Sequence, residues 1–399
     1  MAKKLRVGIL FGGRSSEHEV SLLSAASVLQ AIDHDQFDVT PIGITKEGRW
    51  LAAADARGLL SGDEGAAGQQ LRAGDPAATP GAKLLHDGIP TLLSPEPVRS
   101  PAPDQGRKPG GQHLGGQPLD VVFPVLHGTF GEDGTIQGLF ELAGIAYVGS
   151  GVLGSAAGMD KDVMKRLFVQ AKLPIVRHIT LLRADWEESP RKAIAQIERA
   201  LAYPVFVKPA NLGSSVGISK AHDRKELGPA LVMAAKYDRK LIVEQGVGGK
   251  KSGPASRARE FEVAVLGNDD PKASVVGEII PGKEFYDYEA KYLSEGSVPV
   301  IPAKLTREQN RQIREMAVTA FRACDLSGLA RVDFLMEPGG RQRIFVNEVN
   351  TMPGFTRISM YPKLWEASGL SYKELITRLI ELALQRQAEK GRTAYSREE

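Results

Sequence analysis

The sequence is short of cysteine, of long apolar runs and of aromatic residues, and each shortage excludes a class of protein. Cys324 is the one cysteine among 399 residues, which excludes a disulfide framework and favours a reducing compartment. The apolar run at residues 7–11 is too short for a signal peptide. No stretch of the sequence approaches the ~20 apolar residues that a membrane-spanning helix needs. We therefore expect a cytoplasmic protein without a membrane partner.

The chain also has only a small excess of charge of one sign. The formal net charge is +3 and aromatic residues make up 6% of the chain, whereas a nucleic-acid-binding surface combines a basic stripe with aromatic side chains. One basic cluster, Lys250 and Lys251 with Arg257 and Arg259 nearby, lies among Gly, Ser and Pro and is more typical of a solvated loop. We therefore expect no nucleic-acid partner.

The first part of the chain alternates strand-like and helix-like segments. Short apolar strands are expected at residues 5–11, 37–44, 120–125 and 146–148. A capping box of Ser16 and Glu19 is expected to begin the helix after the first strand, because these two side chains can bond two free backbone amides. Strands that alternate with helices predict an α/β fold with a doubly wound parallel sheet.

Residues from about 52 to 117 interrupt this pattern. They are rich in Ala, Gly, Pro and Gln with little periodicity, so they bury little apolar surface, and we expect a partly disordered surface insertion without chemistry of its own. Two further mixed units follow, so that three domains are expected, at residues 1–160, 161–248 and 249–399. The strands expected after the insertion are at residues 175–181, 203–208, 240–245, 260–266, 275–280, 329–336 and 343–350.

The last two of these strands are joined by a glycine-rich turn and predict a hairpin with four polar residues on one face. Arg331 and Asp333 lie two residues apart on the first strand, and Glu348 and Asn350 lie two apart on the second. Two carboxylates and an amide oxygen are hard ligands suited to Mg²⁺. A surface salt bridge is the alternative, but the apolar residues between these positions indicate a buried opposite face and favour a metal site.

A glycine-rich turn at residues 211–217 follows the strand that ends at Lys208. Glycines let backbone amides approach phosphate oxygens, and the lysine adds positive charge. The turn matches neither the Walker pattern nor the dinucleotide fingerprint. Taken alone, it is more typical of an ordinary turn than of a phosphate site.

Two other polar segments have more than one interpretation. Residues 127–134 follow a strand, at the sheet edge where open α/β sheets bind ligands, yet a lone His127 there is more often a turn histidine with satisfied hydrogen bonds. Residues 285–292 are dense in tyrosine, which fits either a lid or a strand face.

Together these segments resemble the D-alanine–D-alanine ligases, members of the ATP-grasp superfamily. The matching stretches, which keep the family's order, are residues 12–13 with 16–22, 127–138, 159–161, 207–217, 285–292, 328–333 and 347–356. The resemblance implies a three-domain ATP-grasp fold, in which an N-terminal doubly wound parallel-sheet domain precedes two α+β domains that hold ATP between them. It also implies ATP and D-alanine as substrates, two Mg²⁺ ions with Mn²⁺ as a substitute, and a homodimer.

The resemblance assigns the nucleotide and metal sites to particular residues. Those matched to ATP are Lys161, Lys208, Ser214 and Ser215 near the phosphates, Glu244 and Gln245 at the adenine, and Glu260 at the ribose. The implied magnesium ligands are Asp333, Glu348 and Asn350. Gln245 departs from the pattern, because many relatives have Lys there, and the loop at residues 250–258 is longer than expected.

The resemblance also assigns the residues around the two D-alanine molecules. They are Glu17 at the first ammonium, His127 in the substrate site, Lys291 and Ser359 at the second carboxylate, Arg331 and the Gly354 amide at the oxyanion, and Ser214 with Tyr292 as a latch on Glu17. The implied reaction makes an acyl phosphate that a second amine attacks, giving D-alanyl-D-alanine for peptidoglycan precursor synthesis. In the family, Tyr at position 292 accompanies this dipeptide synthesis, whereas Phe or His accompanies ester synthesis from D-lactate.

Two alternatives share much of this pattern. A D-alanine–D-lactate ligase has the same ATP-grasp machinery and differs at position 292. A nucleotide-binding regulatory protein without catalysis predicts gaps among the metal or oxyanion residues, and the sequence has none.

Overall fold

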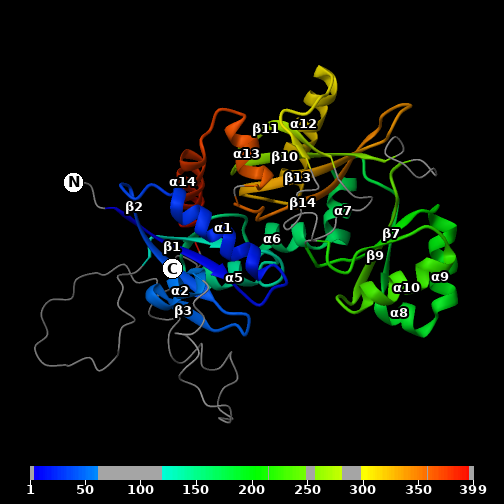
Figure 1. Cartoon of the computed structure of the whole chain (residues 1–399), viewed down its shortest axis with the longest axis horizontal. Coiled ribbons are helices and arrows are strands. Elements are labelled where there is room, and N and C mark those ends of the chain that lie inside the picture. The colour runs from blue at the N-terminus through cyan, green and yellow to red at the C-terminus, as the bar shows by residue number, and fades with distance from the viewer. Residues whose placement is uncertain are drawn as a thin grey trace, which may run out of the picture.

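The computed structural model describes residues 4–61, 119–213, 215–248, 257–280, 298–356 and 358–394. Three sheets follow one another along the chain, each with its own helices (Figure 1). Ser214, Lys291 and Tyr292 lie outside the described residues, as do most of the predicted insertion and of the loop at 250–258. The insertion begins later than predicted, because residues 53–61 form a helix, α2(Ala53–Ser61), whose Ala56 is fully buried.

The first sheet is mainly parallel, as predicted. Its strands run in the order β3(Trp50–Ala52), β2(Phe37–Ile44), β1(Leu5–Gly12), β4(Val121–Val125) and β5(Ala146–Tyr147). All neighbours pair in parallel except β2 and β3. Helices α1(His18–Ala31), α5(Thr135–Leu142) and α6(Val152–Met159) belong to this unit.

The predicted capping box at the start of α1 is wrong. The residue at the helix boundary is Glu17, and no side chain caps the helix there. Glu19 forms an ion pair with Lys46 instead, while Ser16 is exposed. The capping pattern is a local signal, and it does not reveal that Glu19 pairs with Lys46 of another segment. Glu17 therefore lies directly before α1, at the edge of the sheet where the parallel strands end.

The second sheet is antiparallel and small. Its order is β6(His178–Leu182), β9(Lys240–Gln245), β7(Val205–Pro209) and β8(Ser219–Ala221). Helices α8(Arg183–Glu188), α9(Pro190–Ala200) and α10(Arg224–Ala235) accompany it. Ile197 of α9 and Leu227 and Leu231 of α10 pack with Val205 and Val207 in one core.

The third sheet is antiparallel as well. Its order is β12(Val298–Val300), β11(Lys272–Ile280), β10(Arg259–Gly267), β13(Gly328–Met336) and β14(Ile344–Asn350). Helix α12(Arg307–Ala323) covers one face, and its start carries a capping box of Thr306 and Gln309. Helix α13(Met360–Glu366) packs on β10 and β11.

Two helices join these units. Met164 and Phe168 of α7(Lys161–Gln170) pack in the core of the third sheet with Phe261 and Phe334, although α7 precedes the second sheet in the chain. Helix α14(Tyr372–Lys390) returns to the first sheet, where its apolar face shares a core with β4. Each fully buried Leu or Ile side chain contributes roughly 1.5–3 kcal/mol, so α14 fastens the carboxyl end of the chain to its amino-terminal unit.

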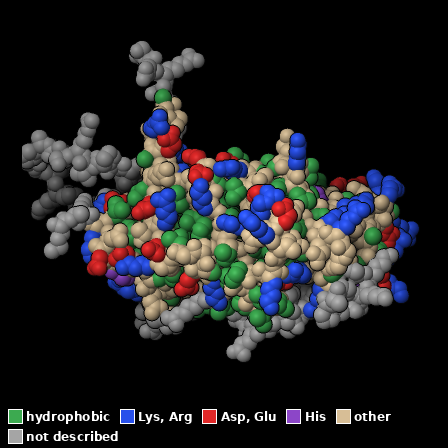
Figure 2. Space-filling model, turned by 90° about the horizontal axis from the view of Figure 1, so that it is seen from above, with side chains coloured by type: hydrophobic (Ala, Val, Ile, Leu, Met, Phe, Trp, Pro, Cys, Tyr) green, Lys and Arg blue, Asp and Glu red, His purple; other side chains and the backbone are tan. Residues whose placement is uncertain are grey.

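The surface shows no single dominant charge on the face drawn in Figure 2, where acidic and basic side chains are interspersed. Within the described part of the chain, no helix is both long and apolar enough to cross a membrane.

Candidate active site

A cavity of about 540 Å³ is lined by residues from all three units. Of the residues predicted for a site, those that line it are Glu17, Lys161, Lys208, Ser215, Glu244, Gln245, Glu260, Arg331, Asp333, Glu348, Asn350, Gly354 and Ser359. They come from α1, α7, β7, β9, β10, β13, β14 and the loops beside them, so the fold gathers in one place residues that are more than three hundred positions apart.

The hairpin β13–β14 forms one wall of the cavity. Its register places Asp333 opposite Glu348 and Arg331 opposite Asn350, as the alternation of side chains in a strand predicts. Arg331 Nε and Nη2 donate to the two carboxylate oxygens of Asp333, both at 2.7 Å. Val332, on the opposite face, is fully buried. The four polar groups therefore meet on the cavity side of the hairpin.

This wall offers oxygen ligands for a hard cation. Asp333 and Glu348 supply two carboxylates and Asn350 an amide oxygen, a donor set of the kind that Mg²⁺ takes together with waters and substrate phosphates. Among the described residues no group of three or more His, Cys, Asp or Glu side chains is arranged to enclose a metal. The donors therefore fit magnesium only as a partial shell that a phosphate substrate would complete.

Two lysines bring positive charge to the same cavity. Lys161, the first residue of α7, donates from Nζ to the Leu212 carbonyl at 3.0 Å and lies 3.3 Å from Glu348 Oε2. Its position is set by Asp160, whose carboxylate caps α7. Lys208 Nζ lies 2.7 Å from Glu244 Oε2. Burial by itself would lower the pKa of Lys208, but the carboxylates of Glu244 and Glu348 raise it above its usual value, so Lys208 is cationic.

Glu244 is held between two lysines. Its Oε1 lies 2.9 Å from Lys165 Nζ, and its Oε2 contacts Lys208. Burial would raise the pKa of Glu244, yet the two ammonium groups hold it well below its usual range. The neighbouring Gln245 accepts a hydrogen bond on Oε1 from the Ala202 amide at 3.1 Å. Both members of the predicted adenine pair therefore have partners within the protein.

Apolar side chains from both antiparallel sheets line the cavity beside this pair. Phe206, Ile218 and Val247 come from the second unit, and Phe261 and Leu335 come from the third. Flat aromatic ligands gain most from such apolar walls, with a few polar groups to fix their orientation. The cavity thus combines an apolar lining with cations and with carboxylates, which suits a purine nucleotide.

Glu17 is enclosed by glycines. A Cβ added at Gly128 would lie 2.7 Å from Glu17 Oε2, and one added at Gly213 would lie 2.8 Å from the same atom. Larger residues at these positions would displace the carboxylate, and Gly128 also has a φ of +75° that disfavours them. The glycine-rich turn of the second unit therefore reaches the start of α1 in the first.

Glu132 was missed by the sequence interpretation. It lines the cavity and is buried, and it accepts hydrogen bonds from the amides of Gly128 at 2.6 Å and Met352 at 3.0 Å. Burial, with the nearby charge of Glu17, raises the pKa of Glu132 to about 8. The signal was an acid inside a glycine-punctuated loop after a buried strand, but only full burial distinguishes it from its half-buried neighbour Asp133. Glu262 was also missed: it lines the cavity 3.3 Å from Arg331.

His127 does not line the cavity. Its Nδ1 donates to the Met352 carbonyl at 3.0 Å, which leaves Nε2 of the neutral ring to accept from Ser24 Oγ at 3.1 Å. Burial lowers the pKa of His127, in keeping with a neutral ring. His127 thus fixes its loop to the segment after β14, and its place in the substrate site stays a prediction.

Gly354 and Ser359 lie together in the loop before α13. A Cβ at Gly354 would come within 2.8 Å of Ser359 Oγ, and that hydroxyl accepts a hydrogen bond from the Thr356 amide at 3.0 Å. The close approach keeps the backbone of Gly354 open to the cavity, where a side chain would block it.

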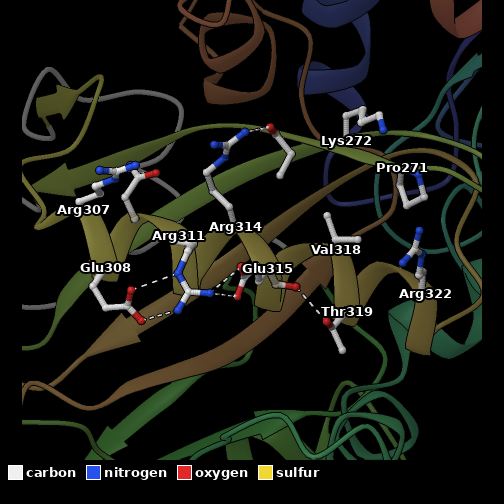
Figure 3. Close-up of a pocket in the computed structure, with 12 residues that line it drawn as sticks. Pro271, Lys272, Arg307, Glu308, Arg311, Arg314, Glu315, Val318, Thr319 and Arg322 are labelled. Carbon is white, nitrogen blue, oxygen red and sulfur yellow. Dashed lines mark hydrogen bonds and ion pairs between the residues drawn. The ribbon is translucent and has the colours of Figure 1, made fainter.

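A second hollow, of about 920 Å³, runs along α12 and contains none of the predicted site residues (Figure 3). Two of its arginines, Arg311 and Arg314, are already engaged. Arg311 pairs with Glu308 at 2.6 Å and Glu315 at 2.8 Å, and Arg314 donates to the Ala273 carbonyl at 2.9 Å. This hollow has no feature of a catalytic site.

The chain is similar to known proteins over nearly its whole length. The family model described as D-ala D-ala ligase N-terminus matches residues 6–150, and that described as D-ala D-ala ligase C-terminus matches residues 167–381. The D-alanine–D-alanine ligases of Acetivibrio thermocellus and Geobacillus kaustophilus are 50% and 48% identical to it, over 97% and 98% of both chains.

Solved structures agree with this relationship. The D-alanine–D-alanine ligase from Coxiella burnetii superposes with a TM-score of 0.74 at 34% identity and covers 98% of this chain and 97% of its own. The VanG D-Ala:D-Ser ligase from Enterococcus faecalis reaches the same TM-score and identity, over 96% of this chain and 100% of its own. The cavity between three sheets, the matched family models and these relatives lead to one conclusion: this chain belongs to the D-alanine–D-alanine ligase family.

Proposed function

We propose that this protein joins two molecules of D-alanine to D-alanyl-D-alanine, for peptidoglycan precursor synthesis, with conversion of ATP to ADP and phosphate. One observation carries the proposal. Glu17 of the first unit, Lys208 of the second and Arg331 of the third line a single cavity, so that a carboxylate for an ammonium, a cation for phosphates and a guanidinium for an oxyanion are within reach of one another. Membership of the ligase family supports the same assignment.

The nucleotide is assigned to the side of the cavity between the two antiparallel sheets. Lys161 and Lys208 hold the phosphates, with Ser214 and Ser215 of the glycine-rich turn beside them. The adenine lies against Phe206 and Phe261, with the backbone and side chains of Glu244 and Gln245 at its edge, and Glu260 holds the ribose. The contacts of Glu244 support a role in organising this region, because its charge is fixed by lysines on both oxygens.

Asp333, Glu348 and Asn350 would hold two Mg²⁺ ions, with Mn²⁺ as a substitute. When bound, these ions would neutralise charge on the transferring phosphoryl group. Side chains of the protein supply further charge neutralisation and orientation. Lys161 lies 3.3 Å from Glu348 and offsets further negative charge of the phosphates. Arg331 is oriented by its contacts with Asp333 and Glu262.

The chemistry follows from positioning and charge neutralisation, which is most of what phosphoryl transfer asks of a protein. The first D-alanine is held by its ammonium at Glu17. Its carboxylate attacks the γ-phosphorus, the bond to the β-phosphate oxygen breaks, and ADP leaves an acyl phosphate behind. The neutral amine of the second D-alanine, whose carboxylate is held by Lys291 and Ser359, then attacks the acyl carbon. The nitrogen loses a proton, the bond from the acyl carbon to the phosphate oxygen breaks, and phosphate leaves.

The tetrahedral species between these bonds carries an oxyanion. Arg331 and the Gly354 amide stabilise it, and removal of one such donor commonly costs ~3–4 kcal/mol of barrier. An acyl phosphate hydrolyses readily, so water must be excluded while it exists. Ser214 and Tyr292 serve this purpose as a latch on Glu17, with the tyrosine-rich segment as the lid. The close approach of Gly213 to Glu17 supports the latch.

The cellular setting belongs to the same proposal. We assign the protein to the cytoplasm, as a homodimer with domains at residues 1–160, 161–248 and 249–399, each of which contains one of the three sheets.

The test is the release of ADP from ATP with and without D-alanine, with separation of the products. ADP release that depends on D-alanine, with D-alanyl-D-alanine as product, is the expected result. D-alanine, D-serine and D-lactate offered together as acceptors identify the preferred one. Release of ADP without dependence on D-alanine would refute the assignment.

A further inference from the structure

Lys165 is a fully buried lysine to which the proposed mechanism gives no task. It lies on α7, one turn after Lys161, with 0% of the residue exposed. Its Nζ lies 2.9 Å from Glu244 Oε1 and donates to the Asn347 carbonyl at 3.2 Å. It does not line the cavity, so it does not touch a ligand there.

Its partner Glu244 is shared with a residue of the proposed nucleotide site. Lys165 takes one carboxylate oxygen and Lys208 takes the other, at 2.7 Å. Burial lowers the pKa of Lys165, against the attraction of Glu244. Glu244 thus has one cation on each carboxylate oxygen, so it keeps a partner when either lysine moves away.

The second cation beside Glu244 becomes important when a triphosphate enters the cavity. The Lys208 ammonium has three N–H donors, and a shift of Nζ toward a phosphate oxygen weakens or breaks its ion pair with Glu244. If Lys208 were the only partner of Glu244, its departure would leave a buried carboxylate unpaired, at a large free-energy cost. With Lys165 in place, the carboxylate keeps a cation throughout, and Lys208 is free to change partners.

We infer that Lys165 is a positioning residue for the nucleotide: it is the permanent counter-ion of Glu244, and it lets Lys208 turn from Glu244 to the phosphates of ATP. The second contact of Lys165 reaches Asn347, next to Glu348 in the chain, and so ties the nucleotide wall at β9 to the hairpin that carries the carboxylates. The inference rests on the proposed function, because it takes Lys208 as a phosphate ligand.

The experiment compares ATP binding by the full-length wild-type protein and by variants of it, by calorimetry with magnesium present and D-alanine absent. Lys165→Met is expected to bind ATP about 10- to 100-fold more weakly than the wild type, because Glu244 then competes with the phosphate for Lys208. In a Glu244→Gln background the competing charge is gone. There, the additional Lys165→Met change is expected to alter affinity by less than about threefold.

This dependence on Glu244 separates positioning from a merely structural role. Lys240 is a matched control, since it is another largely buried lysine, paired with Asp160 at 2.6 Å and with no contact to Glu244. Any effect of Lys240→Met on ATP affinity is expected to be the same with Glu or Gln at position 244. Lys165→Arg, which keeps the charge, is expected to recover most of the affinity.

The outcomes separate this inference from the proposed function. If the wild type does not bind ATP, the proposed function fails. If the wild type binds ATP and Lys165→Met binds it equally well, or loses affinity by the same factor with Gln at position 244, Lys165 is not a positioning residue and the proposed function stands. Lys165→Gln keeps a donor for Asn347 without the charge, and it replaces Lys165→Met in the same comparison if that variant does not fold.

Discussion

Glu348→Gln tests most directly the wall of the cavity formed by Arg331, Asp333, Glu348 and Asn350 of the β13–β14 hairpin, the carboxylate wall. The substitution keeps size and shape and removes one negative charge opposite Asp333 on the hairpin. Lys161 loses an ion pair at 3.3 Å but keeps its bond to the Leu212 carbonyl. The Glu348 side chain is 24% exposed, and a Gln side chain there keeps an amide oxygen that can accept from Lys161, so the ammonium is not left without a partner. The fold is therefore expected to survive.

The effect on turnover is expected to be much larger than the effect on stability. Loss of one charged group that stabilises the transferring phosphoryl commonly raises the barrier by ~3–4 kcal/mol, which corresponds to a 10²- to 10³-fold lower rate. We expect ADP release in the presence of ATP and D-alanine to fall by at least this factor, and the melting temperature to change by only a few degrees. A coupled ADP assay over a range of magnesium concentrations, with a thermal melt of the same samples, measures both.

Glu337→Gln is the matched control. Glu337 follows β13 on the same hairpin, its side chain is 25% exposed, and it pairs with Arg343 away from the cavity. Its substitution removes the same charge from the same hairpin and is expected to leave turnover unchanged. Near-normal turnover of Glu348→Gln at saturating magnesium would refute the assignment of Glu348 as a metal ligand, and equal losses in both variants would show that any charge change on the hairpin is harmful.

Three further predictions follow from the other features. Glu132 keeps its proton in the folded protein up to a pKa of about 8, whereas the unfolded chain loses it near pH 4.5. The free energy of unfolding is therefore expected to fall by up to ~1.4 kcal/mol per pH unit between those values. Thermal melts from pH 5 to 8.5 should show a smaller slope for Glu132→Gln than for the wild type, and an equal slope would contradict the raised pKa. Deletion of residues 62–110 is expected to leave ADP release largely intact, because their composition is typical of a tolerated insertion; an inactive but folded deletion would show that the segment shapes the site. Tyr292→Phe removes a hydroxyl from the proposed latch at a cost of roughly 1–3 kcal/mol, so dipeptide synthesis should weaken and the share of ester product from D-lactate should rise. Competition between D-alanine and D-lactate as acceptors measures both. A wild type that prefers D-lactate would overturn the acceptor assignment.

The sequence alone determined the features that depend on local periodicity. Side chains alternate along a strand, so Arg331, Asp333, Glu348 and Asn350 were assigned to one face of a hairpin before any coordinates, and the register confirms it. The parallel first sheet followed in the same way, from apolar strands that alternate with helices.

Only the tertiary structure decided which charged groups lie out of water. Glu244, Lys165 and Lys208 come from β9, α7 and β7, and no local pattern marks them as a cluster. Glu132 is buried because the segment after β14 returns against its loop, and the same return gives His127 two protein partners. Desolvation depends on how distant segments pack, whereas periodicity depends on neighbours in the chain. For this reason the sequence alone determined the residues of the carboxylate wall, and the packing of the three units determined the charges around it.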